Sequence, residues 1–164
     1  MKRSFVIVMI GMLFQSCAAT VSHRQTIDNE PMLIGIIDQN ELSQEFPVFK
    51  KNYDAYVPND SAIGSLKTFS EKVHIEIFLG TWCGDSKRNL AAFLKTLDLA
   101  GMSNVTYTMR AVDRTKKDKE HLTEKYSIKR VPTMVFLKNE NEIGRITEYP
   151  ERSVEDDMLF ILGQ

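Results

Sequence analysis

Cys83 is the residue of this sequence best suited to covalent chemistry. It belongs to the segment TWCGDS at 81–86, which follows an apolar run at 73–79 and precedes a helical pattern that starts near Gly84. At the N-terminus of a helix, free backbone N–H groups and the helix dipole stabilise an anion. The placement therefore predicts a nucleophilic thiolate. The alternative is a buried and inert cysteine, which is common in proteins.

The first residues of the chain have the layout of a secretory signal peptide. Lys2 and Arg3 form a positive start, and an apolar run follows at 5–14. The run is too short to span a bilayer, which takes about 20 residues. We therefore predict a signal peptide at 1–16, with an uncleaved core helix as the alternative.

The second cysteine, Cys17, directly follows this segment and is the predicted lipidation site. Its position resembles that of the lipidated cysteine in a bacterial lipoprotein signal. Cleavage after Ala19 without a lipid is the alternative. In either case Cys83 is the thiol that remains, so the mature protein is expected to hold no structural disulfide.

The length of 164 residues favours a single domain. We predict a polar tether at 17–31 and one globular domain at 32–164. The expected location is the cell envelope, with a lipid anchor in a bacterial membrane and the domain facing the periplasm. The net charge of -1 gives no sign of a nucleic-acid partner.

Hydrophobic patterning predicts alternating strands and helices. The expected strands are an edge strand or packed loop at 32–37, strands at 73–79 and 105–112, and a hairpin formed by 133–137 and 143–147. The expected helices are a pattern at 41–56 interrupted by Pro47, a short helix at 61–69, a helix at 84–99 stopped by Gly101, a solvated helix at 116–126, and a final helix with a capping-box start at Ser153. This order predicts an α/β sandwich around a mixed sheet.

Two motifs and the closing hairpin resemble the thioredoxin-like family. The first motif is Trp82-Cys83 at a strand-to-helix junction, and the second is Val131-Pro132 just before the third strand. The resemblance covers roughly residues 60–163. It implies a three-layer sandwich with helices on both faces of the sheet. It also implies a cis peptide bond before Pro132, with this proline against the sulfur of Cys83.

The sequence departs from the two-cysteine members of that family at three places. Ser86 stands where they have a resolving cysteine, and Ile77 stands where they have a buried aspartate. Ser86 could still donate a hydrogen bond to the thiolate. Asp85 stands where the family often has Pro, His or Tyr. It would either oppose thiolate formation as a like charge or satisfy backbone donors at the helix start. Lys87 and Arg88 would favour the thiolate.

The candidate catalytic residues are Cys83, Ser86, Trp82 and Pro132. The resemblance implies thiol–disulfide exchange through mixed disulfides, with a protein or a small thiol as partner and no cofactor. The rival hypothesis is a redox-inactive binding or chaperone-like module that holds a peptide in the groove beside Pro132.

The histidines of the chain give no metal-binding motif. His23, His74 and His121 are scattered, so no metal site is predicted. His74 and Glu76 share a strand face and are expected to form a polar pair near the sheet surface.

Overall fold

The computed structural model describes residues 23–163. The predicted signal peptide and the predicted lipidation of Cys17 lie outside these residues. Within the described part of the chain, no helix has the length and apolar character that a membrane crossing requires.

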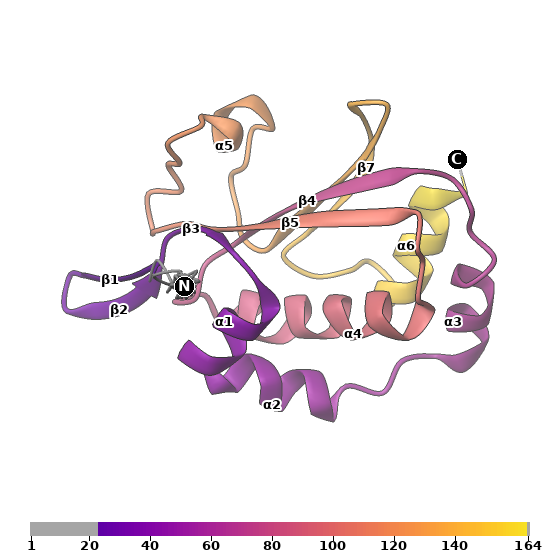
Figure 1. Ribbon diagram of the computed structural model, residues 1–164, viewed down its shortest axis with the longest axis horizontal. Helices are drawn as coiled ribbons and strands as arrows, with labels where there is room; N and C mark the ends of the chain where they lie inside the picture. The colour runs from indigo at the N-terminus through magenta and orange to yellow at the C-terminus, as the bar shows by residue number, and fades with distance from the viewer. Residues whose placement is uncertain (1–22, 164) are drawn as a thin grey trace, which may run out of the picture.

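A five-stranded mixed sheet forms the centre of the domain (Figure 1). Its strands, in spatial order, are β3 (Gly35–Ile37), β5 (Val105–Ala111), β4 (Val73–Leu79), β6 (Thr133–Lys138) and β7 (Asn141–Thr147). β4 and β5 are parallel, and the other neighbours are antiparallel. The predicted mixed sheet with a closing hairpin is confirmed, and the apolar run at 32–37 contributes the edge strand β3.

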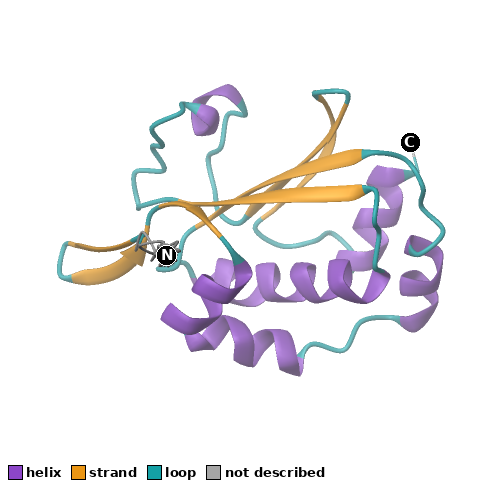
Figure 2. Ribbon diagram, in the orientation of Figure 1, coloured by secondary structure: helices purple, strands orange, loops and turns teal. Residues whose placement is uncertain are grey.

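The helices lie on both faces of the sheet but are divided unequally (Figure 2). One face carries α1 (Gln39–Glu45), α2 (Pro47–Ala55), α3 (Asp60–Leu66), the π-helical turn η1 (Ser86–Leu90), α4 (Ala91–Ala100) and α6 (Val154–Leu162). The opposite face carries only the single turn α5 (Leu122–Lys125) among the described helices. The chain therefore adopts the expected α/β sandwich, with one thick and one thin helical layer.

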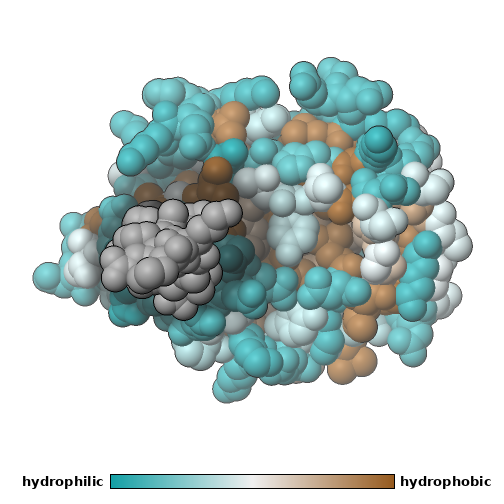
Figure 3. Space-filling view, viewed as in Figure 1, coloured by the Kyte–Doolittle hydropathy of each residue, from teal (hydrophilic) through white to brown (hydrophobic). Residues whose placement is uncertain are grey.

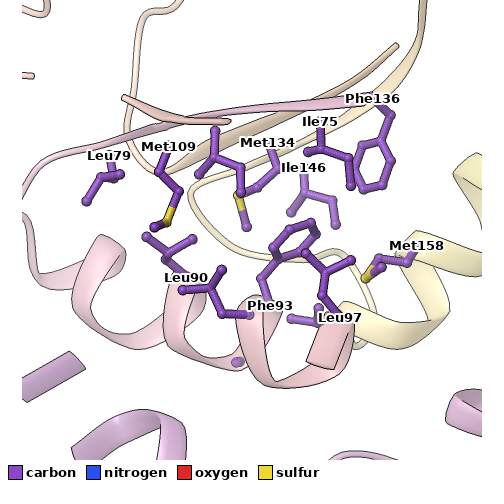
Figure 4. Close-up of a cluster of buried hydrophobic side chains, with 14 of the residues drawn as sticks. Ile75, Leu79, Leu90, Phe93, Leu97, Met109, Met134, Phe136, Ile146 and Met158 are labelled. Atoms are coloured by element: carbon purple, nitrogen blue, oxygen red, sulfur yellow. The ribbon is translucent and has the colours of Figure 1, made fainter. Parts of the chain in front are cut away.

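The main core lies between the sheet and the thick layer (Figure 4). Phe93 of α4 points toward the sheet and meets Phe136 of β6 edge-to-face, with ring centroids 6.0 Å apart. Both side chains are fully buried. Burying a side chain of this size contributes about 1.5–3 kcal/mol to stability. In Figure 3, hydrophobic residues show between the sheet and the helices, whereas hydrophilic residues form most of the outline.

A second, smaller core lies on the opposite face of the sheet. Alternation along β4 directs Ile77 into the main core and Phe78 into the second core. The second core also contains Val131 and is contacted by the partly buried Trp82 and Cys83. The motif residues are therefore anchored on the thin side of the sandwich.

Several predicted element ends agree with the structure. The N-cap of α6 is Ser153, whose hydroxyl oxygen accepts a hydrogen bond from the Asp156 N–H at 3.1 Å. Gly101 ends α4 with a φ of 58°, in the left-handed region. Pro47 does not interrupt one helix but starts a new one, because it is the first residue of α2.

The predicted helix at 116–126 is wrong, because only its last part forms the turn α5. Lys116 and His121 have φ values of 57° and 56°, which a continuous α-helix does not allow. The Asp118 carboxylate also accepts hydrogen bonds from the N–H groups of Leu122 and Thr123. Such side-chain bonds compete with helical pairing and hold this segment as a loop.

The described part of the predicted tether, together with the first two residues of the predicted domain, forms a hairpin of β1 (Arg24–Ile27) and β2 (Glu30–Leu33). Asp28 and Asn29 connect the two strands with φ values of 51° and 62°. A two-residue turn with both φ values positive suits a hairpin, and Asp and Asn tolerate this region well. This local signal was present in the sequence and was missed by the tether interpretation.

Candidate functional site

Cys83 lies at the junction of β4 and the helix that begins with η1. Its N–H donates to the carbonyl oxygen of Gly80 at 2.9 Å, which closes a tight turn after the strand. Its own carbonyl oxygen accepts from the N–H of Lys87 at 3.2 Å, which is the first helical bond. The side chain is half-buried. The alternative of a fully buried cysteine therefore does not describe this residue.

The Cys83 thiol lies against the segment that contains Pro132. The Sγ atom donates a hydrogen bond to the carbonyl oxygen of Val131 at 3.1 Å. The Val131-Pro132 peptide bond is cis, as the resemblance implied. The structure thus brings together Cys83 and Pro132, two of the four candidate residues.

Ser86 has a different hydrogen bond from the one expected. Its side chain is fully buried, and its hydroxyl oxygen accepts from the N–H of Gly80 at 3.2 Å. Among the described residues it has no hydrogen bond to Cys83. Ser86 therefore fixes the turn that carries Cys83 instead of contacting the sulfur directly.

Asp85 occupies the N-cap position of η1, but its side chain does not cap the helix and its charge is paired. It makes no capping hydrogen bond, and its carboxylate pairs with Arg88 at 2.5 Å. The expectation that it satisfies backbone donors is therefore wrong. The physical reason is that Asp85 itself has helical φ and ψ angles, so the chain has already entered the helix at this residue.

Trp82 is held in place by a hydrogen bond, a close contact with Gly80 and two cations over its ring. Its indole N–H donates to the carbonyl oxygen of Val112 at 2.9 Å. A Cβ atom added to Gly80 would lie 2.6 Å from the indole ring, so the tryptophan needs a glycine at this position. Arg114 and Lys116 lie over the ring, with their charged groups 4.9 and 5.8 Å from its centroid.

The sequence predicts no role in the site for three residues of this neighbourhood. They are Thr81, Arg114 and Lys116. The buried hydroxyl of Thr81 accepts a hydrogen bond from the Leu33 N–H at 3.2 Å, which ties the N-terminal hairpin to the motif. No short-range pattern in the sequence predicts these contacts, because Thr81 meets Leu33, and Arg114 and Lys116 meet Trp82, only when distant segments fold together.

The other polar candidates do not join the site. Glu76 lies on the opposite face of β4 from Ile77, where it bonds to His74 at 3.3 Å and to Arg110 at 3.0 Å. The predicted His74–Glu76 pair is confirmed. His23 and His121 pair with Glu41 and Glu124.

The described residues contain no group of three potential metal ligands. A groove of about 670 Å³ lies beside α5 and is lined in part by His74, Glu76 and Tyr126. Cys83 is not among its lining residues. The groove is therefore separate from the thiol.

Several solved structures are similar to this chain, at low sequence identity. A Pseudomonas aeruginosa protein of unknown function has a similar structure, with a TM-score of 0.54, 16% identity, and coverage of 77% of this chain and 84% of the other. An HIV epitope-scaffold has a TM-score of 0.50 and 17% identity, with coverage of 77% and 78%. The reduced thioredoxin 2 of Pseudomonas aeruginosa PAO1 is 23% identical, with a TM-score of 0.41 and coverage of 66% and 93%.

A comparison with curated sequences gives no significant match. The sequence profile of the family described as thioredoxin matches residues 38–158. This range includes Trp82, Cys83, Ser86 and Pro132 and spans most of the chain, so the protein belongs to the thioredoxin family.

Proposed function

We propose that this protein carries out thiol–disulfide exchange through Cys83 alone. The observation that carries the proposal is the half-buried thiol at the start of a helix, in hydrogen-bond contact with the residue before the cis proline. The family supports a redox function of the thiol–disulfide type in general. The single-cysteine mechanism is our inference from the residues around Cys83.

The exchange consists of two substitutions at sulfur. The Cys83 thiolate attacks one sulfur of a disulfide, forms a new S–S bond, and expels the other sulfur as a thiolate with the electron pair of the broken bond. A thiolate from outside then attacks the sulfur bound to Cys83 and restores the Cys83 thiolate. The attacking thiol ends in a new disulfide, so Cys83 itself undergoes no net oxidation or reduction.

An outside thiol is needed because residues 23–163 hold no second thiol that could resolve the intermediate. Cys83 is the one cysteine among residues 23–163, and the position of the resolving thiol holds Ser86. Ile77 is fully buried in the main core, so that position offers no carboxylate as a proton relay. The absence of both groups is consistent with exchange and unfavourable for net reduction.

In the resting state the thiol is held as a hydrogen-bond donor. Its proton points to the carbonyl oxygen of Val131, so this bond must break when the thiolate forms. The free carbonyl oxygen could then accept a hydrogen bond from a partner's main chain. The sulfur of Cys83 would thus attack the disulfide while the neighbouring carbonyl oxygen of Val131 binds the partner's main chain.

The experiment is capture of a mixed disulfide. The full chain is incubated with hydroxyethyl disulfide, and the adduct is measured by mass spectrometry. Cys83→Ser is the control that accounts for any reaction at Cys17. We expect Cys83-dependent adduct formation faster than that of an unstructured cysteine peptide at neutral pH. A rate no faster than the peptide's would reject exchange and favour the binding module.

We further propose that residues 1–16 direct export and that Cys17 carries a lipid anchor in the cell envelope. The support is the order of charged, apolar and small residues before Cys17. Fractionation of cells that express the wild type or Cys17→Ser tests the anchor. Equal membrane association of the two proteins would reject it.

A further inference from the structure

Two cations lie over the indole ring of Trp82, the residue next to Cys83. The guanidinium carbon of Arg114 is 4.9 Å from the ring centroid, and the ammonium nitrogen of Lys116 is 5.8 Å from it. A cation over an aromatic face is attracted by the ring, most strongly for tryptophan. Both cations are therefore held over the side chain of the residue that directly precedes Cys83.

The loop that carries these cations is fixed by its own hydrogen bonds. The Asp113 carboxylate accepts from the N–H groups of Thr115 and Lys116 at 2.8 and 3.0 Å, and from the Thr115 hydroxyl at 2.7 Å. Lys116 has a φ of 57°, which is unfavourable for a lysine. Such strain persists only where the surroundings enforce it, and it is common at functional sites.

The other arginines near the motif are neutralised by nearby carboxylates. Arg88 pairs with Asp85 at 2.5 Å, and Arg130, which precedes the cis peptide, pairs with Glu148 at 2.8 Å. Lys116 differs, because its ammonium group donates to the carbonyl oxygen of Arg114 at 3.2 Å and pairs with no carboxylate of residues 23–163. The positive charge of Lys116 is therefore not compensated by a carboxylate of the described residues.

Arg114 has a partner that is easy to replace. It pairs with Glu30 of the N-terminal hairpin at 2.6 Å, and about half of each side chain is exposed. Exposed pairs of this kind contribute little to stability, about 0–1 kcal/mol. A carboxylate from a substrate could therefore take the place of Glu30 at small cost, and a guanidinium can bind it through two parallel hydrogen bonds.

We propose that Arg114 and Lys116 form an anion-binding site that selects disulfides carrying carboxylates, with Glu30 as its occupant when no substrate is bound. The inference rests on the proposed exchange at Cys83 and names the substrate class of that site. The covalent steps are those given above. The cations act on the charged ends of the substrate and do not touch its sulfur atoms.

The test compares three small disulfides that differ in charge. They are dithiodiglycolate with carboxylate ends, hydroxyethyl disulfide with neutral ends, and cystamine with ammonium ends. Rates of adduct formation at Cys83 are divided by those of an unstructured cysteine peptide, which removes differences in intrinsic reactivity. We expect dithiodiglycolate to be favoured over cystamine by about tenfold at low salt. The preference should shrink near 1 M salt, where charges are screened beyond about 3 Å.

Variants assign the preference to individual residues. Both cations lie over Trp82, so their removal is judged by the ratio of the dithiodiglycolate rate to the cystamine rate and not by either rate alone. Arg114→Gln with Lys116→Gln should bring this ratio close to one. Glu30→Gln should raise the rate with dithiodiglycolate by about twofold. Lys138→Gln is the matched control, since Lys138 pairs with Glu71 at the end of β6 away from Pro132. It should leave the ratio unchanged.

The outcomes separate the two proposals. Equal corrected rates for the three disulfides in the wild type, or a preference that survives in the double variant, would overturn the anion site while exchange stands. A thiol that is unreactive even toward hydroxyethyl disulfide would reject exchange and the anion site with it. A thermal melt of each variant shows that it is folded. Lys116→Gln alone is a milder variant. It should lower the ratio of the dithiodiglycolate rate to the cystamine rate, but by less than the double variant does.

Discussion

The Sγ atom of Cys83 lies 3.1 Å from the carbonyl oxygen of Val131, a residue 48 positions later in the chain. The antiparallel pairing of β4 with β6 produces this contact, because Phe78 at the end of β4 is opposite Thr133 at the start of β6. The turn after β4 and the cis peptide before β6 therefore meet at the same end of the sheet. The Cys83 thiol is thus placed next to the backbone of the cis-proline segment.

We expect Ser86→Cys to convert exchange into reduction of the substrate. The new thiol would attack the mixed disulfide on Cys83 and release the second half of the substrate, so each chain would free two thiols per disulfide in place of one. A thiol assay with the captured adduct counts them. Loss of the Ser86–Gly80 hydrogen bond should lower the free energy of unfolding by about 1 kcal/mol.

Ser86→Ala is the matched control for this prediction. It removes the same hydroxyl without adding a thiol, so it should share the loss of stability and release only one thiol. If Ser86→Cys also releases only one thiol, the geometry around the turn does not allow a second sulfur to reach Cys83. The interpretation of Ser86 as the lost resolving position would then be wrong.

Gly80→Ala should displace Trp82. The added methyl group would lie 2.6 Å from the indole ring, which is closer than real contacts allow, so the ring must move away from its hydrogen bond to Val112. The chain has one tryptophan, so its fluorescence reports this movement directly. We expect a shifted emission maximum and a loss of stability of about 1–3 kcal/mol.

Gly64→Ala provides the comparison for this substitution. Gly64 lies within α3, and an added Cβ atom would contact nothing within 4 Å. Alanine at this helical position should raise stability by up to about 1 kcal/mol and leave the tryptophan emission unchanged. A wild-type emission spectrum for Gly80→Ala would show that the indole is not held where the contact distance requires it.

The loop before α5 should loosen at acidic pH. Burial of the Asp118 carboxyl raises its pKa, but hydrogen bonds from Thr123, Leu122 and Glu120 outweigh burial, so the pKa is lowered from the ordinary 3.8. The folded state then holds its proton less tightly than the unfolded state. The stabilisation is complete above about pH 4 and is lost as the pH falls through the folded-state pKa.

Asp118→Asn tests this linkage. We expect the variant to lose about 1 kcal/mol near neutral pH, a loss comparable with that of a helix cap, and to show a smaller further loss on acidification than the wild type. Urea unfolding at a series of pH values measures both effects. Parallel pH profiles for the two proteins would show that Asp118 does not contribute to acid sensitivity.

Much of the fold could be predicted from local patterns. The run at 73–79 forms β4 with the predicted bounds, and Ser153 and Gly101 act at helix ends as their residue types suggest. These signals are local, since strand alternation, side-chain capping and positive φ depend on a few neighbouring residues. The prediction failed at 116–126, where the composition suits a helix but Asp118 supplies competing hydrogen bonds.

Residue types and spacing were enough to assign the family and to place Cys83 and Ser86 in its motif. Only the tertiary structure placed Arg114 and Lys116 over Trp82, and Glu30 against Arg114. Their positions depend on how β5 and the N-terminal hairpin meet the β4 turn. Contacts between such distant segments leave no periodic signal along the chain, because they arise only when the sheet and its loops are packed together.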